Sequence, residues 1–557
     1  MNTKKSSLSK ITTLVANDFK KYWIFAFIEF MEFFFASSSV ILLNKEKLSD
    51  LKYTVAGILQ PNGFESGFVA MVFPIIAAFL VFGYLHNIAS VTATHSMPIS
   101  RKEHFAGHCI SGYLLTALPI IVNGIILGVI ISVKNVGSIF AVTKLVLLML
   151  LMSLVTYAFS ILAGMLVGTA TLHILGAITL NLFVPAIIII TDSNLEILLK
   201  GYCTPEWGEK LMGLFLPIMK VAEITALDII WYIALAGILL TLSLVAYEKR
   251  PLENATDGLI FRFTEPIIVG LLTFMFASTM GEYFRSYGDI NRYFFGFVIG
   301  IIVGYVLLTM ICEKSVRIFN KRNIRNAAIF ICIMALFIGG AKLDITGYAK
   351  RIPEETNIQS VQITSFESTG YTSSVEGMIE WANDNMDSFL DSEENIELIR
   401  AIHSQLLTKR ECDGQEIYFL IGIKYNQKNG TKVCREYQIP FKEVKNIPEI
   451  EKLYNSGEFK EKYGFGEYAR IKCNEIKHIE YSTNDYEEIN QVNNPGKLLE
   501  ALNKDFAKRT FTQELKGKQY GYIDIYLKDN ANTYNEITIY KSDANTIAEL
   551  KQQGILK

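Results

Sequence analysis

The sequence predicts a polytopic α-helical membrane protein of about nine spans, followed by a C-terminal α+β domain outside the membrane. Three observations carry this prediction. Long apolar runs recur through residues 1–340, where only 45 residues are charged. Residues 341–557 contain 63 charged residues and no run long enough to span a bilayer. The net charge changes with the composition, from +5 in the first part to −7 in the second.

The composition also excludes several classes of protein. Aromatic residues make up 12% of the chain, which argues against disorder. A pI of about 6.4 and the absence of a basic domain argue against nucleic-acid binding. Seven cysteines without a CxxC pair predict neither a zinc site nor a disulfide framework. The first apolar run begins near Trp23 after a polar stretch, and no small-residue cleavage site follows it, so we expect no cleavable signal peptide.

Nine segments reach or approach the roughly 20 apolar residues that a spanning helix needs. The number of spans is thereby predicted to within about one. Each should be helical, because lipid offers no hydrogen-bond partners to an open backbone. The segments are Trp23–Leu43, Gly67–Tyr84, Ile110–Val133, Leu145–Gly168, Ile174–Ile190, Ile229–Ala246, Pro266–Met280, Tyr293–Ile311 and Ala327–Gly340.

The distribution of lysine and arginine predicts the orientation. Basic residues gather before the first span and after the second, sixth and eighth. They are Lys4, Lys5, Lys10, Lys20 and Lys21; Arg101 and Lys102; Lys249, Arg250 and Arg262; and Lys314, Arg317, Lys321, Arg322 and Arg325. With the N-terminus in the cytoplasm, all four clusters are cytoplasmic, as the positive-inside rule requires. We therefore expect a multi-pass protein of the cell membrane with residues 341–557 extracellular.

Residues 1–22 form the first predicted element. Ile11, Leu14, Val15 and Phe19 recur at helical spacing among lysines, which favours a short helix in the cytoplasmic interface. The alternative is a polar extension of the first span. Residues 23–340 then form the transmembrane domain.

The first span carries an unusual polar face. Glu29, Glu32, Ala36 and Ser39 are spaced by three and four residues, so they share one side of the helix. A carboxyl group in a span is costly unless it is paired or hydrated, which makes it a functional candidate. The alternative is structural, with the glutamates bonded to neighbouring helices. Both interpretations place the face inside the bundle.

Several helices show small-xxx-small spacing, which lets helix backbones approach closely. Gly296, Gly300 and Gly304 provide two consecutive steps. Packing within one chain is the more common use of such a face, and a seam between two chains of a dimer is the alternative.

The segment from His95 to Phe105 reads HSMPISRKEHF. Pro98 interrupts a helix, and Ser100 can cap a new one that begins at Arg101. His104 and His108 lie one helical turn apart, but no cysteine or carboxylate completes a metal site, so we expect no bound metal.

This segment, between the second and third spans, resembles the "(H)SLP(I/V)(S/T)R" element of bacterial ABC transporter permeases of the type-2 exporter class. Arg250-Pro251-Leu252-Glu253-Asn254-Ala255 resembles their "RxSExAG" element, although Leu252 and Thr256 replace its serine and glycine. In that family the first element lies near a coupling helix in a groove of the ATPase subunit. The resemblance thus assigns ATPase coupling to the following residues: His95, Met97, Pro98, Arg101 and Lys102.

The resemblance implies that the chain is a permease that expels an amphipathic substrate such as a peptide, antibiotic or lipid. Its partners would be the lipid bilayer, an ATP-binding cassette ATPase and a second permease, identical or related. The sequence has no GxxxxGK[ST] loop, so ATP and Mg would bind to the partner ATPase, and this chain would hold no cofactor. The alternative is a non-transporting membrane sensor whose outer domain binds a ligand.

The C-terminal part begins with a tether, residues 341–354. Two α+β units are expected to follow, over 355–465 and 466–557, each in the order strand, helix, hairpin, helix, which suggests an internal duplication. Asn429-Gly430 marks the first hairpin turn. His403 and His478 lack a visible nucleophile or base partner, so we expect binding or gating rather than catalysis. The arrangement also resembles an uncharacterised domain attached to some of these permeases.

Overall fold

The computed structural model describes the chain except for residues 1, 45–47, 61–62, 252–257, 259, 261–264, 288–289, 370–388, 413–417, 445–446, 464–475, 484–488, 512, 514–517, 529–533 and 557. The chain divides into two compact units. Unit 1 consists of Met1–Thr191, Glu206–Glu282 and Phe295–Cys332. Unit 2 consists of Asp192–Pro205, Tyr283–Phe294 and Ile333–Lys557.

Within the described residues, nine helices are long and apolar enough to cross a membrane. These nine segments are Ser7–Leu43, Ser66–His86, Arg101–Lys134, Ile139–Leu166, Ala170–Leu198, Ala226–Lys249, Glu265–Arg285, Ile290–Glu313 and Lys321–Lys342. The predicted number of apolar helices is therefore confirmed, and a multi-pass membrane protein is the class that this composition supports.

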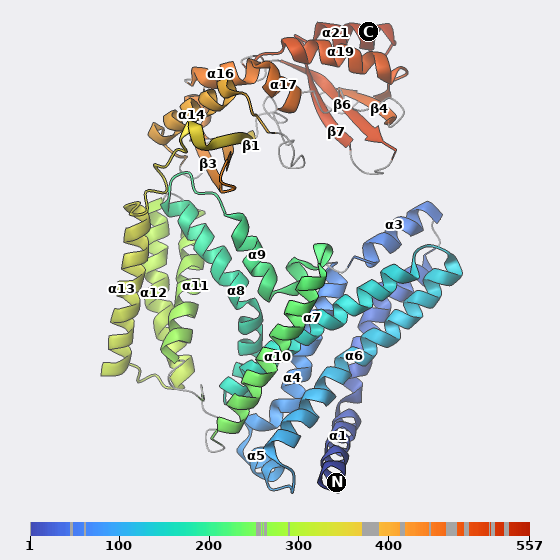
Figure 1. Cartoon of the computed structure of the whole chain (residues 1–557), viewed down its shortest axis with the longest axis vertical. Coiled ribbons are helices and arrows are strands. Elements are labelled where there is room, and N and C mark those ends of the chain that lie inside the picture. The colour runs from blue at the N-terminus through green and yellow to red at the C-terminus, as the bar shows by residue number, and fades with distance from the viewer. Residues whose placement is uncertain are drawn as a thin grey trace. The chain divides into compact units, whose positions relative to one another are not determined.

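Figure 1 shows the helices of the apolar part. They are α1 (Asn2–Phe33), α2 (Ser39–Leu43), α3 (Leu48–Ile58), α4 (Phe64–Phe82), α5 (Ile88–His95), α6 (Arg101–Lys134), α7 (Ile139–Leu166), α8 (Ala170–Leu198), α9 (Glu206–Phe215), α10 (Ala226–Lys249), α11 (Glu265–Arg285), α12 (Ile290–Glu313) and α13 (Lys321–Lys342). A π-helical segment, Phe34–Ser38, joins α1 to α2. In unit 1, α1, α4, α6, α7 and α10 pack into one bundle.

The N-terminal segment is not a separate interfacial helix, because α1 continues unbroken from Asn2 to Phe33. Its first turns pack on α6. A Cβ atom on Gly107 would lie 2.9 Å from the side chain of Leu14, and the Asp18 carboxylate accepts hydrogen bonds from Ser111 and pairs with His108 at 2.7 Å. This buried polar contact holds the segment against α6.

The glycine face of α12 packs within the chain. A Cβ atom on Gly300 would lie 2.5 Å from the Cα of Ala277, and one on Gly304 would lie 2.9 Å from the ring of Phe276. Both neighbours belong to α11. Gly296, one turn earlier on the same helix, is buried. The small residues thus allow α11 and α12 to approach closely.

Unit 2 contains two antiparallel sheets. The first has the order β1-β2-β3, and the second β5-β4-β6-β7. The strands are β1 (Ile358–Thr369), β2 (Tyr418–Gln427), β3 (Lys432–Pro440), β4 (Ile476–Thr483), β5 (Ile489–Gln491), β6 (Gln519–Leu527) and β7 (Tyr534–Tyr540). The helices are α14 (Glu393–Thr408), α15 (Phe441–Val444), α16 (Pro448–Asn455), α17 (Gly457–Tyr463), α19 (Pro495–Lys508) and α21 (Ala544–Gln552).

The predicted order of elements recurs in the two sheets. In each, a strand precedes a helix and pairs with the first strand of the following hairpin, as β1 does with β2 and β4 with β6. The first hairpin turns at Asn429-Gly430, where Gly430 has φ +81°. In Figure 1, α19 and α21 lie together on one face of the second sheet. The pattern of Glu376–Leu390 also predicts a helix, and this segment falls almost entirely outside the described residues.

Candidate functional site

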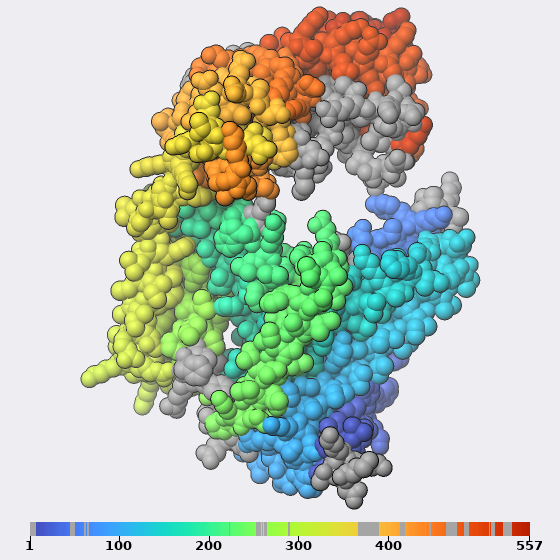
Figure 2. Space-filling view, viewed as in Figure 1, coloured from blue at the N-terminus to red at the C-terminus, as the bar shows by residue number. Residues whose placement is uncertain are grey.

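The segment between α5 and α6 forms a tight, exposed turn. Ser100 caps α6 in a capping box, in which its hydroxyl accepts from the Glu103 N–H and the Glu103 carboxylate accepts from the Ser100 N–H. Met97 and Pro98 lie at the tip and are exposed. In Figure 2 this stretch, in light blue, lies on the surface at the lower end of unit 1. The predicted helix break and the predicted cap are confirmed.

The two basic residues at the start of α6 differ in their surroundings. Arg101 is half-buried, and its guanidinium donates to the carbonyls of Glu248, at 2.8 Å, and Arg250, at 3.4 Å. Lys102 is exposed and lies 3.6 Å from the Glu248 carboxylate. Arg101 therefore fixes the turn to the C-terminal end of α10, whereas Met97, Pro98 and Lys102 are exposed and available to another molecule.

A buried arginine lies beneath this turn. Arg250 is 3% exposed, and its guanidinium donates to the carbonyls of Gly164, Met165 and Leu85 at 2.9, 3.3 and 3.0 Å. Burial lowers the pKa of Arg250 to about 10, which still leaves it positive at neutral pH. One side chain thus joins the ends of α4, α7 and α10. The remainder of the second sequence element, residues 252–255, lies outside the described residues.

A chain of aromatic and histidine side chains extends this network. The hydroxyl of Tyr247 hydrogen-bonds with His95 Nε2 at 3.2 Å and with the Tyr84 hydroxyl at 2.9 Å. Farther along, His86 and His173 share a hydrogen bond of 2.9 Å. His95 thus faces inward, toward α10, rather than outward at the tip.

His104 and His108 are buried in α6 rather than solvated in a loop. Across the described part of the chain, no group of three or more histidine, cysteine, aspartate or glutamate residues is placed to hold a metal ion.

The polar face of the first span points into the protein. Glu29 is fully buried, whereas Phe27 is 51% exposed on another face of α1. Neither carboxyl oxygen of Glu29 has a hydrogen-bond partner among the described residues. Ser39 is buried and donates to the carbonyl of Phe35 in the preceding π-helical segment, and Glu32 is half-buried. Glu29 is thus a fully buried carboxyl group on this face, and neither of its oxygens has a hydrogen-bond partner among the described residues to offset the cost of burial.

Replacing Glu29 with methionine should raise the thermal midpoint of the purified protein, because a buried acid without a partner costs about 1–3 kcal/mol. Glu29→Gln keeps the polarity and should leave the midpoint nearly unchanged. The measurement is thermal unfolding in detergent, with Phe27→Met, at the exposed position, as the control. A lower midpoint for Glu29→Met would show that the carboxyl group has a stabilising partner.

The connection after α8 is bonded to the first sheet of unit 2. Cys203 and Cys434 form a disulfide with a Cα–Cα distance of 5.7 Å, so the expectation of no disulfide framework is wrong. Gly201 donates its N–H to the Glu411 carboxylate at 3.1 Å and accepts from the Glu436 N–H at 3.4 Å. Gly201 has φ +67°, and a Cβ atom there would lie 2.6 Å from the Tyr437 ring, so only glycine fits.

The ring of Tyr437 belongs to a buried polar cluster in the same sheet. His403 hydrogen-bonds with the hydroxyl of Tyr425 at 3.0 Å and with that of Tyr437 at 2.8 Å. Burial lowers the pKa of His403 to about 3, so the imidazole is neutral between its two partners. An imidazole bonded on both sides to tyrosine hydroxyls supports a structural role.

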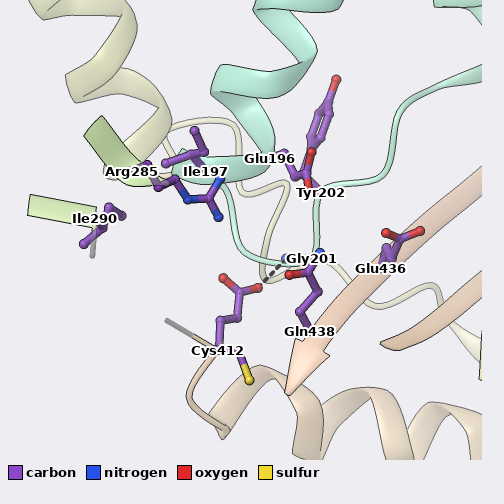
Figure 3. A pocket seen from close by; sticks show the side chains of 10 residues that line it. Glu196, Ile197, Gly201, Tyr202, Arg285, Ile290, Cys412, Glu436 and Gln438 are labelled. Carbon is purple, nitrogen blue, oxygen red and sulfur yellow. Dashed lines mark hydrogen bonds between the residues drawn. The ribbon is translucent and has the colours of Figure 1, made fainter. Parts of the chain in front are cut away.

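A pocket of about 200 Å³ opens beside the Gly201 turn (Figure 3). Its lining comes from the end of α8, the facing ends of α11 and α12, the segment before β2, and β3. The lining residues are Glu196, Ile197, Gly201, Tyr202, Arg285, Ile290, Glu411, Cys412, Glu436 and Gln438. Cys434, Glu436 and Gln438 alternate along β3, so one face of this strand carries both the disulfide and part of the pocket. No local sequence motif indicates this site, because its residues come from separate segments of the chain.

No family model, curated protein or solved structure matches this chain.

Proposed function

We propose that this chain is the membrane-spanning permease subunit of an ATP-driven ABC transporter that moves an amphipathic substrate. The observation that carries the proposal is the α5–α6 turn. Its exposed tip is fixed to α10 by Arg101, and the buried Arg250 joins α10 to the ends of α4 and α7. A force applied at the tip would reach several helices at once, which is what coupling to a separate ATPase requires.

The proposed orientation has independent support. With the N-terminus in the cytoplasm, nine spans place the ends of α8 and α13 and the turn between α11 and α12 on the outer side. The same segments, Asp192–Pro205, Tyr283–Phe294 and Ile333 onward, belong to unit 2. The Cys203–Cys434 disulfide fits an oxidising, extracytoplasmic compartment. The assignment of these three segments to unit 2 and the position of the disulfide both agree with the membrane orientation inferred from the lysine and arginine residues.

Thiol labelling in intact cells should give opposite results at two exposed positions. In a background without the four free cysteines, Lys428→Cys should react with an impermeant maleimide, and Arg325→Cys should react only after the cells are opened. If Arg325→Cys but not Lys428→Cys is labelled in intact cells, the orientation is the opposite of the one proposed. The α5–α6 turn would then lie outside the cytoplasm, which excludes coupling to a cytoplasmic ATPase there.

Coupling predicts that an ATPase co-purifies with the chain and that substitutions at the tip weaken the complex. Met97→Asp combined with Pro98→Ala should lower the recovered ATPase about tenfold or more, because the exposed apolar contact is replaced by a charge. Ile88→Asp, at an exposed position on α5 away from the tip, is the control. The proposal fails if the tip variant retains full ATPase recovery and substrate-stimulated hydrolysis.

A ligand sensor is the second candidate, and the pocket of unit 2 is the observation that favours it. A sensor would act through its cytoplasmic loops without an ATPase. Signalling in a strain that lacks every co-purifying ATPase would favour the sensor, whereas loss of function there would favour the permease.

A further inference from the structure

An apolar groove lies between α12 and α13, which run side by side in Figure 1, and ends at the turn that joins them. Its volume is about 210 Å³, below the roughly 300–1,000 Å³ of pockets that enclose drug-sized ligands. Both helices are long and apolar enough to span a bilayer, and the lining of the groove belongs to unit 1. A groove of this size on spanning helices suits part of one acyl chain rather than a bulky molecule.

Buried polar contacts hold the base of the groove. The Tyr305 hydroxyl donates to the carbonyl of Asn323 at 2.9 Å. The Asn323 amide donates to the carbonyl of Ile318 and to the Glu313 carboxylate, each at 2.9 Å. The ring of Tyr305 stacks on that of Phe330, with the centroids 6.4 Å apart. These contacts fix α12, the turn and α13 to one another, so the groove is already formed in the folded chain.

The rim of the groove consists of exposed apolar side chains. Ile302 belongs to α12, and Ile324 and Ile331 belong to α13. Phe319 lies in the turn itself and is 77% exposed. Such side chains on spanning helices meet the hydrocarbon of the bilayer, which is as apolar as they are. The groove therefore opens toward lipid.

The turn at the end of the groove is strongly basic. Residues 313–325 include five lysine and arginine residues and one acidic residue. Arg322 pairs with the Glu265 carboxylate at 2.9 Å and is set aside. A basic cluster directly at the end of a spanning helix reaches the level of the lipid headgroups and attracts anionic ones. Three of its exposed members are Arg317, Lys321 and Arg325.

The combination of groove and charge favours a phospholipid over a second copy of this chain. If two chains met at this groove about an axis normal to the membrane, the same turn of each chain would lie at the same depth. The exposed basic side chains of the two turns would then repel one another. An anionic phospholipid instead supplies the opposite charge and an apolar chain in one molecule.

We propose that this groove binds an anionic phospholipid, with an acyl chain between α12 and α13 and the phosphate at the basic turn. Lys321 and Arg325 lie one helical turn apart on α13 and bind the headgroup. The small side chain of Ala327 leaves the space that the acyl chain fills. The inference does not rest on coupling to an ATPase, because lipid binding is measured on the purified chain alone.

The test is photolabelling of the full chain in detergent with a phosphatidylglycerol that carries a diazirine in one acyl chain. We expect adducts on the groove residues Ile302 and Ile331. Unlabelled dioleoylphosphatidylglycerol should compete at a concentration at least about tenfold lower than dioleoylphosphatidylcholine, which has the same chains and no net charge. This preference should shrink at high salt, because the basic side chains are exposed.

A first variant removes the charge and keeps the groove. Lys321→Gln combined with Arg325→Gln should lower the labelling about tenfold or more. Lys20→Gln combined with Lys249→Gln removes the same charge at exposed positions on other helices and should label like the unsubstituted chain. All four side chains are exposed, so both double variants should fold, and the thermal midpoint in detergent verifies this.

A second variant fills the groove and keeps the charge. Ala327→Phe should exclude the acyl chain and lower the labelling to a similar extent, because residue 327 lines the groove. Ala328→Phe adds the same ring at the next, exposed position of α13, outside the lining, and should label normally. This pair decides the question if the charge variant fails to fold.

Three outcomes overturn the proposal. The first is equal competition by the anionic and the neutral lipid, which would show that the turn does not recognise the headgroup. The second is labelling of the folded charge and groove variants at the level of their controls. The third is a disulfide between two chains carrying Phe319→Cys in membranes, in a background without the four free cysteines, because a second copy would then cover the groove.

Discussion

Arg250→Met is expected to destabilise the purified protein by about 3–4 kcal/mol, among the largest effects of any single substitution. The guanidinium donates to three main-chain carbonyls that belong to Leu85, Gly164 and Met165. Methionine has a similar length but no donor, so these acceptors lose a charged partner in a buried site. The loss should appear as a lower thermal midpoint in detergent and a lower yield of monodisperse protein.

Two further variants separate the bonding geometry from the charge. Arg250→Lys keeps the positive charge but cannot present the planar fork, so its midpoint should fall between those of Arg250→Met and the unsubstituted chain. Arg325→Met makes the same change at an exposed position of α13 and should be nearly neutral. If Arg250→Met unfolds at the same temperature as Arg325→Met, the guanidinium does not hold the helix ends together.

Loss of the Cys203–Cys434 disulfide should have the second large effect, about 2–4 kcal/mol on the unfolding of the C-terminal part. The two cysteines are 231 residues apart, but the intervening apolar helices already restrict the unfolded chain. The effect should therefore fall below that of an unstructured loop of this length. The measurement is thermal unfolding of Cys203→Ser, with Cys412→Ser as the matched control, since Cys412 is a free thiol.

A cleavage experiment tests the covalent link directly. A protease site inserted between the exposed residues Glu354 and Glu355 would cut the chain after α13. On a non-reducing gel the cut protein should migrate as one species, and a reductant should release two fragments. Cys203→Ser should give two fragments without reductant. Two fragments from the unsubstituted protein under non-reducing conditions would contradict the disulfide.

Much of the local structure was readable from the sequence, because it depends on short-range chemistry. Pro98 and Ser100 ended one helix and began the next, and Asn429-Gly430 placed the first hairpin turn. The apolar runs gave the nine long helices, since composition and length alone decide that property. The alternation of strands and helices in the C-terminal part followed from periodicity.

The sequence also indicated which residues were candidates for function, but not which groups they would contact. Arg101 was identified as a basic residue of the turn, but its bond to the carbonyl of Glu248 joins residues 147 apart in the chain. No feature of the sequence near Arg250 indicated that its buried side chain would join three helix ends. Its acceptors are main-chain carbonyls, which every residue carries, so only the meeting of α4, α7 and α10 reveals them.

The tertiary structure alone decided the cysteine pairing and the pocket. An odd number of cysteines without close spacing left Cys203 and Cys434 indistinguishable from the free thiols, and only the contact between the turn after α8 and β3 selects them. The pocket combines Arg285, Glu411 and Glu436, which lie on three separate segments. Composition and periodicity report what each segment is, whereas a site built from distant segments exists only once packing has fixed their distances.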